Sequence, residues 1–141
     1  MVDVRHAHGD EISAVLDVWR QADAEPTLTD DEPGIRALLD HSPKSLLVAV
    51  DGDRMVGTLI VGWDGWRGSF YRLAVVADRR REGIARQLVQ EGERQLVALG
   101  ARRLALFAVT GDPGAVAFWE AVGYHGQRDR RRLVKNMTGD L

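Results

Sequence analysis

The 141-residue sequence contains no cysteine, which excludes disulfides, thiolate metal sites and a cysteine nucleophile. No apolar run approaches the roughly 20 residues that a membrane-spanning helix needs. The first residues, MVDVRHAHGDE, contain no apolar segment of the kind found in signal peptides. The four histidines form no cluster with metal-ligand spacing. These absences predict a cytoplasmic protein with no membrane contact and no bound metal.

The net charge is only −2, but it is unevenly distributed along the chain. Residues 1–64 carry 13 acidic and 5 basic side chains, a net of −8, whereas residues 65–141 carry 8 acidic and 14 basic ones, a net of +6. Either these charges lie on ordinary solvated faces, or the second half meets an anion and the first half a cation. A nucleic-acid-binding protein usually has a larger basic excess, so we expect no nucleic-acid partner.

Hydrophobic periodicity predicts one α/β domain spanning residues 1–141. Apolar residues at helical spacing predict helices that begin near residue 10, near residue 35, at residue 84 and, after an Asp-Pro start signal, at residue 113. Alternating or continuous apolar runs predict strands at 2–7, 45–50, 54–63, 69–76 and 102–109, and at least one more within 124–137.

The stretch AVVADRRREGIARQLV, residues 74–89, joins a predicted strand to a predicted helix through a run of arginines. The first amides of a helix have no intrahelical partner and, with the helix dipole, they attract an anion such as phosphate. The small residues Gly83 and Ala85 would let a ligand approach the backbone closely. The alternative is a plain loop with solvated arginines, although arginines there oppose the dipole. A Walker loop and a G-x-G-x-x-G motif are both absent.

Three motifs resemble one known family. The segment RREGIA, residues 80–85, is similar to the Q/R-x-x-G-x-G/A signature of the GNAT superfamily of acyl-CoA-dependent N-acetyltransferases. FYRLAVVAD, residues 70–78, resembles its fourth strand, and DPGAVAFWEAVGY, residues 112–124, resembles its N-x-x-A-x-x-F-Y-x-x-x-G-F element. The resemblance covers essentially the whole chain. GWDGWRGSFYRL, residues 62–73, further resembles the hairpin of the small bacterial YpeA-like subgroup.

The resemblance implies an α/β fold with a twisted, mixed and mostly antiparallel sheet of six to seven strands and about four helices. The sheet would splay between strands 69–76 and 103–109, and acetyl-CoA would lie in the split as co-substrate. Its pantetheine arm would pair with the backbone of one strand, and its pyrophosphate would lie on the helix-start amides. Asp112 stands where the family usually has an Asn, and it could face the ligand. The alternative is that Asp112 only caps the helix. The implied CoA-binding residues are Leu73, Ala74, Val75, Arg80, Arg81, Glu82, Gly83, Ile84, Ala85, Arg86 and Asp112.

The implied chemistry is direct attack of a primary amine, on a small molecule or a protein, on the thioester in a ternary complex. The backbone N–H of Val75 would stabilise the oxyanion. Trp119 stands where the family often has a general-acid tyrosine, and an indole cannot lose a proton at useful pH. Tyr71 is the candidate substitute, because it precedes Leu73 by two residues and alternation puts both on one face of the strand.

Four carboxylates are candidates for the acceptor side and for the general base, although each has a local role in a loop or turn as its alternative. Together they would favour a cationic amine acceptor, and we expect a monomer or a homodimer. Two other functions stay open: a non-catalytic acyl-CoA-binding or sensing domain, which Trp119 favours, and a module that binds only nucleotide phosphates. The four carboxylates are Glu25, Asp30, Asp31 and Asp64.

Overall fold

The computed structural model describes residues 1–139, and the chain forms two compact units, residues 1–106 and the residues from 107 onward. The first unit contains a five-stranded sheet in the order β1-β2-β3-β4-β5. Its first three pairings are antiparallel, and β4 pairs with β5 in parallel. The strands are β1 (Val2–His6), β2 (Leu46–Asp51), β3 (Arg54–Trp63), β4 (Gly68–Val75) and β5 (Leu104–Leu106).

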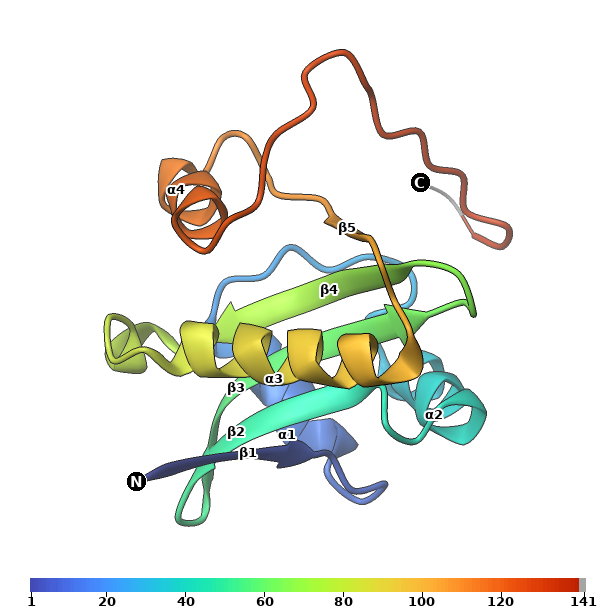
Figure 1. The fold of residues 1–141 in the computed structure, drawn as a ribbon. Helices are drawn as coiled ribbons and strands as arrows, with labels where there is room; N and C mark the ends of the chain where they lie inside the picture. The colour runs from blue at the N-terminus through green and yellow to red at the C-terminus, as the bar shows by residue number, and fades with distance from the viewer. Residues whose placement is uncertain (140–141) are drawn as a thin grey trace. The chain divides into compact units, whose positions relative to one another are not determined.

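Helices cover both faces of this sheet (Figure 1). Helix α3 (Ile84–Leu99) crosses one face, while α1 (Ile12–Gln21) and α2 (Glu32–His41) cover the other. The core between these layers consists of apolar side chains from β2, β3 and the inner faces of the helices, among them Leu46, Leu59 and Leu88. Burial of such side chains supplies the main driving force for this arrangement. A short 3-10 turn, Ala77–Arg79, connects β4 to the approach of α3.

The predicted number of six to seven strands is wrong for the described residues, which form five. The expected strand at 102–109 shortens to β5, and the segment 124–137 contains no strand. Six charged side chains crowd residues 128–135, with only Leu133 and Val134 as large apolar neighbours. Such a segment has too little apolar surface to bury on either face of a sheet, so its backbone stays irregular.

The second unit contains α4 (Pro113–Ala121) followed by irregular backbone. Asp112 caps this helix by accepting a hydrogen bond from the N–H of Ala115 at 3.1 Å. Trp119 packs edge-on against two rings, with centroid distances of 5.2 Å to Phe118 and 5.1 Å to Tyr124. Among the described residues, no helix is both long enough and apolar enough to cross a membrane.

A bidentate ion pair ties β1 to the start of α1. Both Arg5 Nη atoms donate to Glu11, at 2.9 and 2.8 Å, and the N–H of His8 donates to the same carboxylate at 2.7 Å. The hydrogen bond from Arg5 is the main cause that lowers the pKa of Glu11 from 4.5 to about 2. Because the folded-state pKa is depressed, this pair stabilises the fold above pH 4.5, and the stabilisation is lost as pH falls toward 2.

Glu11→Gln tests this linkage. We expect the variant to lose about 1–2 kcal/mol of unfolding free energy at pH 7, since both partners are partly exposed and solvent screens them. The difference from the parent protein should shrink as pH falls from 5 toward 2. Urea unfolding across that range measures it, and a difference that does not change with pH would contradict the assignment.

Candidate functional site

The edge of β4 is open beyond its first three residues. Strand β5 pairs with Gly68, Ser69 and Phe70, and within residues 1–106 no other strand pairs with that edge from Tyr71 to Val75. The N–H of Val76 donates to the Val56 carbonyl at 3.0 Å, toward β3. Because N–H directions alternate along a strand, the N–H and C=O of Val75 point to the open edge. An extended ligand can therefore accept from the Val75 N–H as an added strand would, while the Val75 carbonyl already accepts from Arg80 Nε at 3.3 Å.

A β-bulge in β4 lies just before this open edge. Thr58 pairs with Ala74 and Ile60 pairs with Tyr71, so two residues of β4, Arg72 and Leu73, oppose one residue of β3. Arg72 adopts φ +53, a left-handed conformation that costs of order 1 kcal/mol for a residue with a side chain. The bulge breaks the pairing pattern at the point where β4 separates from β5.

The bulge also changes which side chains share a face. Residues 58 and 60 lie on one face of β3, so their partners Ala74 and Tyr71 lie together on that face although they are three residues apart. The alternation that was expected to place Tyr71 beside Leu73 is therefore broken, and that prediction does not hold. Tyr71 is half exposed, at 49%. It shares its face with Thr58, which contacts α1 through Trp19.

The start of α3 presents backbone amides at the end of β4 that holds Val75. Gly83 is the N-cap, with φ +83, and no side chain caps the helix. The first intrahelical bond runs from the N–H of Gln87 to the Gly83 carbonyl at 3.0 Å. The amides of residues 84–86 precede that bond and have no intrahelical acceptor. A Cβ at Gly83 would meet no atom within 4 Å, so the space beside the N-cap residue is open.

The arginines between β4 and α3 differ in whether they already have partners. Arg79 is neutralised by Asp51, at 2.9 Å, and by Glu82, at 3.0 Å. Arg80 donates to the carbonyls of Val75 at 3.3 Å and of Ala22 at 3.2 Å. Arg81 and Arg86 are exposed, and within residues 1–139 neither forms an ion pair. These last two are the cations available to an anion at the helix start, whereas the carboxylate of Glu82 is already engaged.

Three of the four candidate acceptor carboxylates already have partners. Asp31 caps α2 by accepting from the N–H of Gly34 at 2.8 Å. Asp30 is paired with Arg72 and is mostly buried. Asp64 accepts from the N–H groups of Trp66 and Arg67, at 2.8 and 2.7 Å, which lowers its pKa. Within residues 1–139 the exposed carboxylate of Glu25 makes no hydrogen bond or ion pair, and it is the only one of the four without a partner there.

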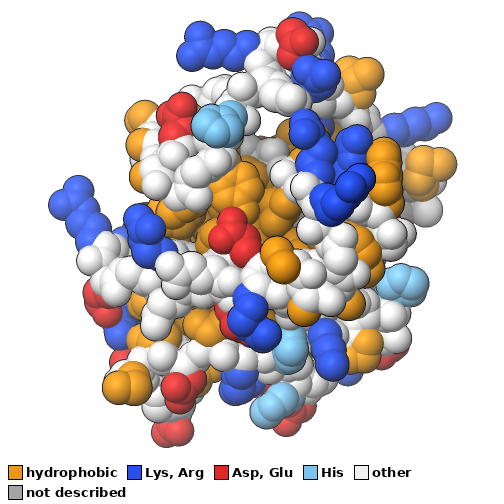
Figure 2. All heavy atoms as spheres, in the orientation of Figure 1, with side chains coloured by type: hydrophobic (Ala, Val, Ile, Leu, Met, Phe, Trp, Pro, Cys, Tyr) orange, Lys and Arg blue, Asp and Glu red, His pale blue; other side chains and the backbone are white. Residues whose placement is uncertain are grey.

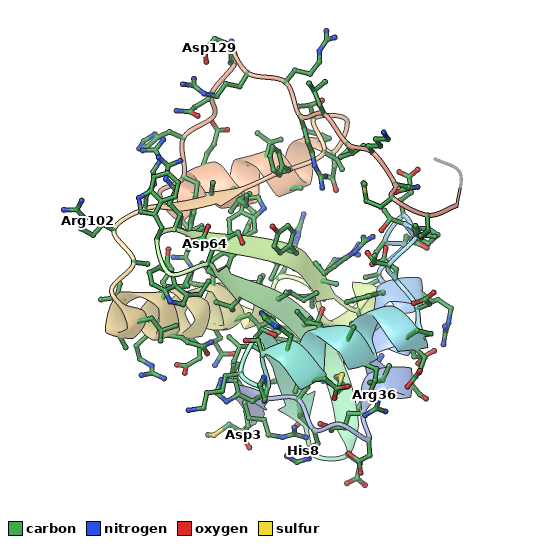
Figure 3. The ribbon with its side chains drawn as sticks, turned by 90° about the vertical axis from the view of Figure 1, so that its right-hand side faces the viewer. Asp3, His8, Arg36, Asp64, Arg102 and Asp129 are labelled. Atoms are coloured by element: carbon green, nitrogen blue, oxygen red, sulfur yellow. The ribbon has the colours of Figure 1, made fainter. Side chains whose placement is uncertain are left out.

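The turn that contains Asp64 lies at the opposite end of β4 from Val75 (Figure 3). Gly68 and Val75 are the two ends of β4, seven residue steps apart, a span of up to about 23 Å. The structure therefore does not bring Asp64 to the open edge. Instead, a hollow of about 350 Å³ at this end is lined by Trp66, Arg67, Arg102 and Arg103, and the Arg67 guanidinium lies 4.0 Å from the Trp66 ring centroid.

Ion pairs connect the acidic first half of the sequence to the basic second half. Asp30 pairs with Arg72 and Asp51 pairs with Arg79. Over α3 and the strands beneath it, Figure 2 shows basic side chains beside acidic ones rather than one surface of a single sign. Part of the charge asymmetry therefore serves the fold. No group of three or more His, Asp or Glu side chains in residues 1–139 is arranged to hold a metal ion.

Sequence reasoning missed the polar network beneath the bulge. The indole N–H of Trp19 donates to the Thr58 hydroxyl at 2.9 Å, and this hydroxyl donates to the Arg72 carbonyl at 2.9 Å. Trp19 and Thr58 are both buried. Their residue types give no signal of this role, because a buried tryptophan at helical spacing is typical of an ordinary core.

The comparisons with known proteins agree with one another. The profile of the acetyltransferase (GNAT) family matches residues 12–124. The chain is 30% identical over 139 residues to an acetyltransferase of Sodalis glossinidius, covering 99% of this chain and 98% of that protein. It is 32% identical over 123 residues to an acetyltransferase of Pectobacterium atrosepticum, covering 87% of each. The crystal structure of the PaiA N-acetyltransferase of Thermoplasma acidophilum in complex with coenzyme A shares the fold, with a TM-score of 0.79 at 12% identity, over 90% of this chain and 91% of that one.

Proposed function

The chain belongs to the acetyltransferase (GNAT) family, and we propose that it transfers an acetyl group from acetyl-CoA to a primary amine. The proposal rests on one observation: two backbone surfaces of the first unit lie next to each other. The open edge at Val75 and the uncapped start of α3 at Gly83 follow each other at the same end of β4. One surface suits an extended amide-bearing arm, and the other suits a phosphate group.

Within this proposal, Val75 and the residues beside it hold the pantetheine arm, and the amides of residues 84–86 hold the pyrophosphate with help from Arg81 and Arg86. Arg80 contributes by fixing the Val75 carbonyl. Acetyl-CoA fits this arrangement because it combines an extended amide chain with a multiply charged anion. Asp112 is left to its helix-capping role, since its carboxylate accepts from the Ala115 amide.

The transfer itself proceeds by direct attack. The amine nitrogen forms a bond to the thioester carbonyl carbon, the carbon–sulfur bond breaks, and the thiolate of CoA leaves. The Val75 N–H donates to the carbonyl oxygen as negative charge develops there. Glu25 accepts the proton that the amine must lose, because it is the acceptor-side candidate whose carboxylate has no other partner within residues 1–139.

We further propose that residues 1–141 act as one GNAT domain of the small bacterial YpeA-like type. Its support is that the family profile crosses the boundary between the two compact units at residues 106 and 107. The GWDGWRGSFYRL hairpin, residues 62–73, carries the subgroup resemblance.

Release of the CoA thiol from acetyl-CoA, followed with a panel of amines, tests the function. We expect turnover with at least one primary amine and stronger turnover with cationic acceptors than with neutral ones. Peptides with free N-termini, lysine-containing peptides and small polyamines cover the acceptor classes. Tight CoA binding with no turnover on any acceptor would contradict the proposal and favour a non-catalytic acyl-CoA-binding domain.

Trp119→Tyr tests whether the missing tyrosine limits the rate. Trp119 packs edge-on between Phe118 and Tyr124, so we expect its replacement to remove packing and cost about 1–2 kcal/mol of unfolding free energy. A general acid contributes about 10²–10⁴-fold to the rate where no other group protonates the leaving thiolate. We expect the native enzyme to protonate it by another route, so turnover should change by less than about 10-fold. A rate gain of about 100-fold or more would show that the native site is deficient in a proton donor.

A further inference from the structure

We propose that Arg72 and Asp30 form a latch that holds the loop between α1 and α2, residues 22–31, against the bulge of β4 and thereby positions the acceptor side of the site. The inference deepens the proposed function and rests on it for the identity of the acceptor. Its physical core is a set of contacts within the first unit, and these can be tested without activity. Both residues are positioning residues rather than catalytic ones.

The guanidinium of Arg72 reaches two points of the loop. Its Nε donates to Asp30 Oδ1 at 3.1 Å, and its Nη2 donates to Asp30 Oδ2. The same Nη2 donates to the carbonyl of Glu25 at 2.8 Å. The side chains of Arg72 and Asp30 are only 21% and 11% exposed. Several of the other ion pairs in the described residues have partners that are about half exposed or more, such as Arg54 with Asp78. A shielded bidentate pair of this kind is a stronger restraint than a solvated one.

Asp30 also organises the loop to which it belongs. The N–H and the hydroxyl of Thr27 donate to the same carboxylate, at 2.6 and 2.9 Å. The segment has no helix or strand of its own, and Arg80 holds its first residue through the carbonyl of Ala22 at 3.2 Å. Removing the Asp30 charge therefore weakens both the side-chain closure of the loop and its contact with β4, while the bond from the Asp30 N–H to the Thr27 carbonyl at 3.1 Å remains.

The other end of the latch is held rigidly. Arg72 sits at the left-handed position of the bulge, and its carbonyl accepts from Thr58, which in turn accepts from the buried indole of Trp19. The Arg72 guanidinium also lies 5.5 Å from the Trp19 ring centroid. Contacts with α1 and β3 therefore fix the backbone at Arg72, while the Arg72 side chain points to the loop. The same bulge leads directly into the open edge at Val75.

The consequence is a physical connection between the strand proposed to hold the thioester and the loop that carries Glu25. The Glu25 carbonyl is bound by Arg72, and the exposed Glu25 carboxylate has no hydrogen bond or ion pair in residues 1–139. Loss of the latch should let Glu25 move and should weaken acceptor binding. It should leave the helix-start amides at residues 84–86 unchanged, because none of the latch contacts reaches them.

Two variants separate the side chain from the backbone. Arg72→Gly removes the guanidinium and keeps a residue that adopts positive φ without strain, so the bulge can persist. Asp30→Asn keeps the shape of the side chain and removes its charge. Arg94→Met is the matched control, because it removes an arginine from an ion pair with Glu91 on the surface of α3, remote from the loop.

Hydrogen exchange of residues 22–31 in the free protein is the first readout. We expect exchange there to rise at least about 10-fold in Arg72→Gly and in Asp30→Asn, with parent-like exchange in Arg94→Met. In steady-state assays the KM for the amine should rise about 10-fold, while the Kd for CoA changes less than about 2-fold. Unchanged loop exchange in both variants would overturn the latch. If the parent protein fails to bind CoA, the proposed function fails, yet the exchange result still decides the latch.

Discussion

Gly83→Asp is expected to weaken CoA binding by at least about 100-fold, which corresponds to about 2.7 kcal/mol. Gly83 is the N-cap of α3 with φ +83, and the amides of residues 84–86 follow it without a side-chain cap. An aspartate there places a negative charge where the pyrophosphate would lie, and its side chain can itself cap these amides. Both effects act on the ligand, and isothermal titration with CoA measures their sum.

Two controls isolate the charge. Gly83→Asn carries nearly the same shape and tolerates positive φ, but it has no charge, so we expect a loss below about 10-fold. Gly100→Asp introduces the same charge and a similar backbone strain at the other end of the same helix, where φ is +102, and CoA affinity should stay close to that of the parent protein. Equal losses in Gly83→Asp and Gly100→Asp would mean that the helix as a whole, rather than its start, was disturbed.

Gly92→Val is expected to cost about 2–3 kcal/mol of unfolding free energy, the range typical of overpacking. Gly92 is buried in the middle of α3, and an added Cβ would lie 2.8 and 2.9 Å from two ring atoms of Phe70 and 3.1 Å from Leu59. Real Cβ contacts are longer, so the buried Phe70 ring or the helix itself must shift. A shift of the helix also displaces the amides at its start, so CoA affinity should fall together with stability.

Gln90→Val is the matched control on the same helix. Residue 90 is exposed, so valine there changes only helix propensity, by about 0.5 kcal/mol. Urea unfolding of both variants gives the comparison. A loss at Gly92 no larger than that at Gln90 would contradict the tight packing of α3 on β3 and β4.

Local signals in the sequence predicted the helices well. The Asp-Pro start at residues 112–113 and the helix start at residue 84, directly after Gly83, are both reproduced by the structure. These signals work because a capping side chain or a positive φ acts within a few residues. The arginine-rich junction likewise has the expected form, a strand end followed by an uncapped helix start.

Local signals in the sequence could not predict the bulge in β4 or the partners of the carboxylates. A bulge depends on the register between two strands, and nothing in FYRLAVVAD indicates that Arg72 and Leu73 together oppose Leu59. Asp30 is separated from Arg72 by 42 residues, so their ion pair follows from tertiary packing alone. The missing strand in 124–137 has a different cause, because the charged side chains of this segment leave too little apolar surface to support the strand that was predicted there.

The central claim is that CoA binds along the open edge of β4 and the start of α3. Amide exchange measured by NMR with and without CoA tests it at the level of single residues. We expect exchange at Val75 and at residues 84–86 to slow by at least about 10-fold when CoA is saturating. The amides of α2, on the opposite face of the sheet from α3 (Figure 1), serve as the internal reference. Saturable CoA binding that leaves Val75 and residues 84–86 unprotected would contradict the account.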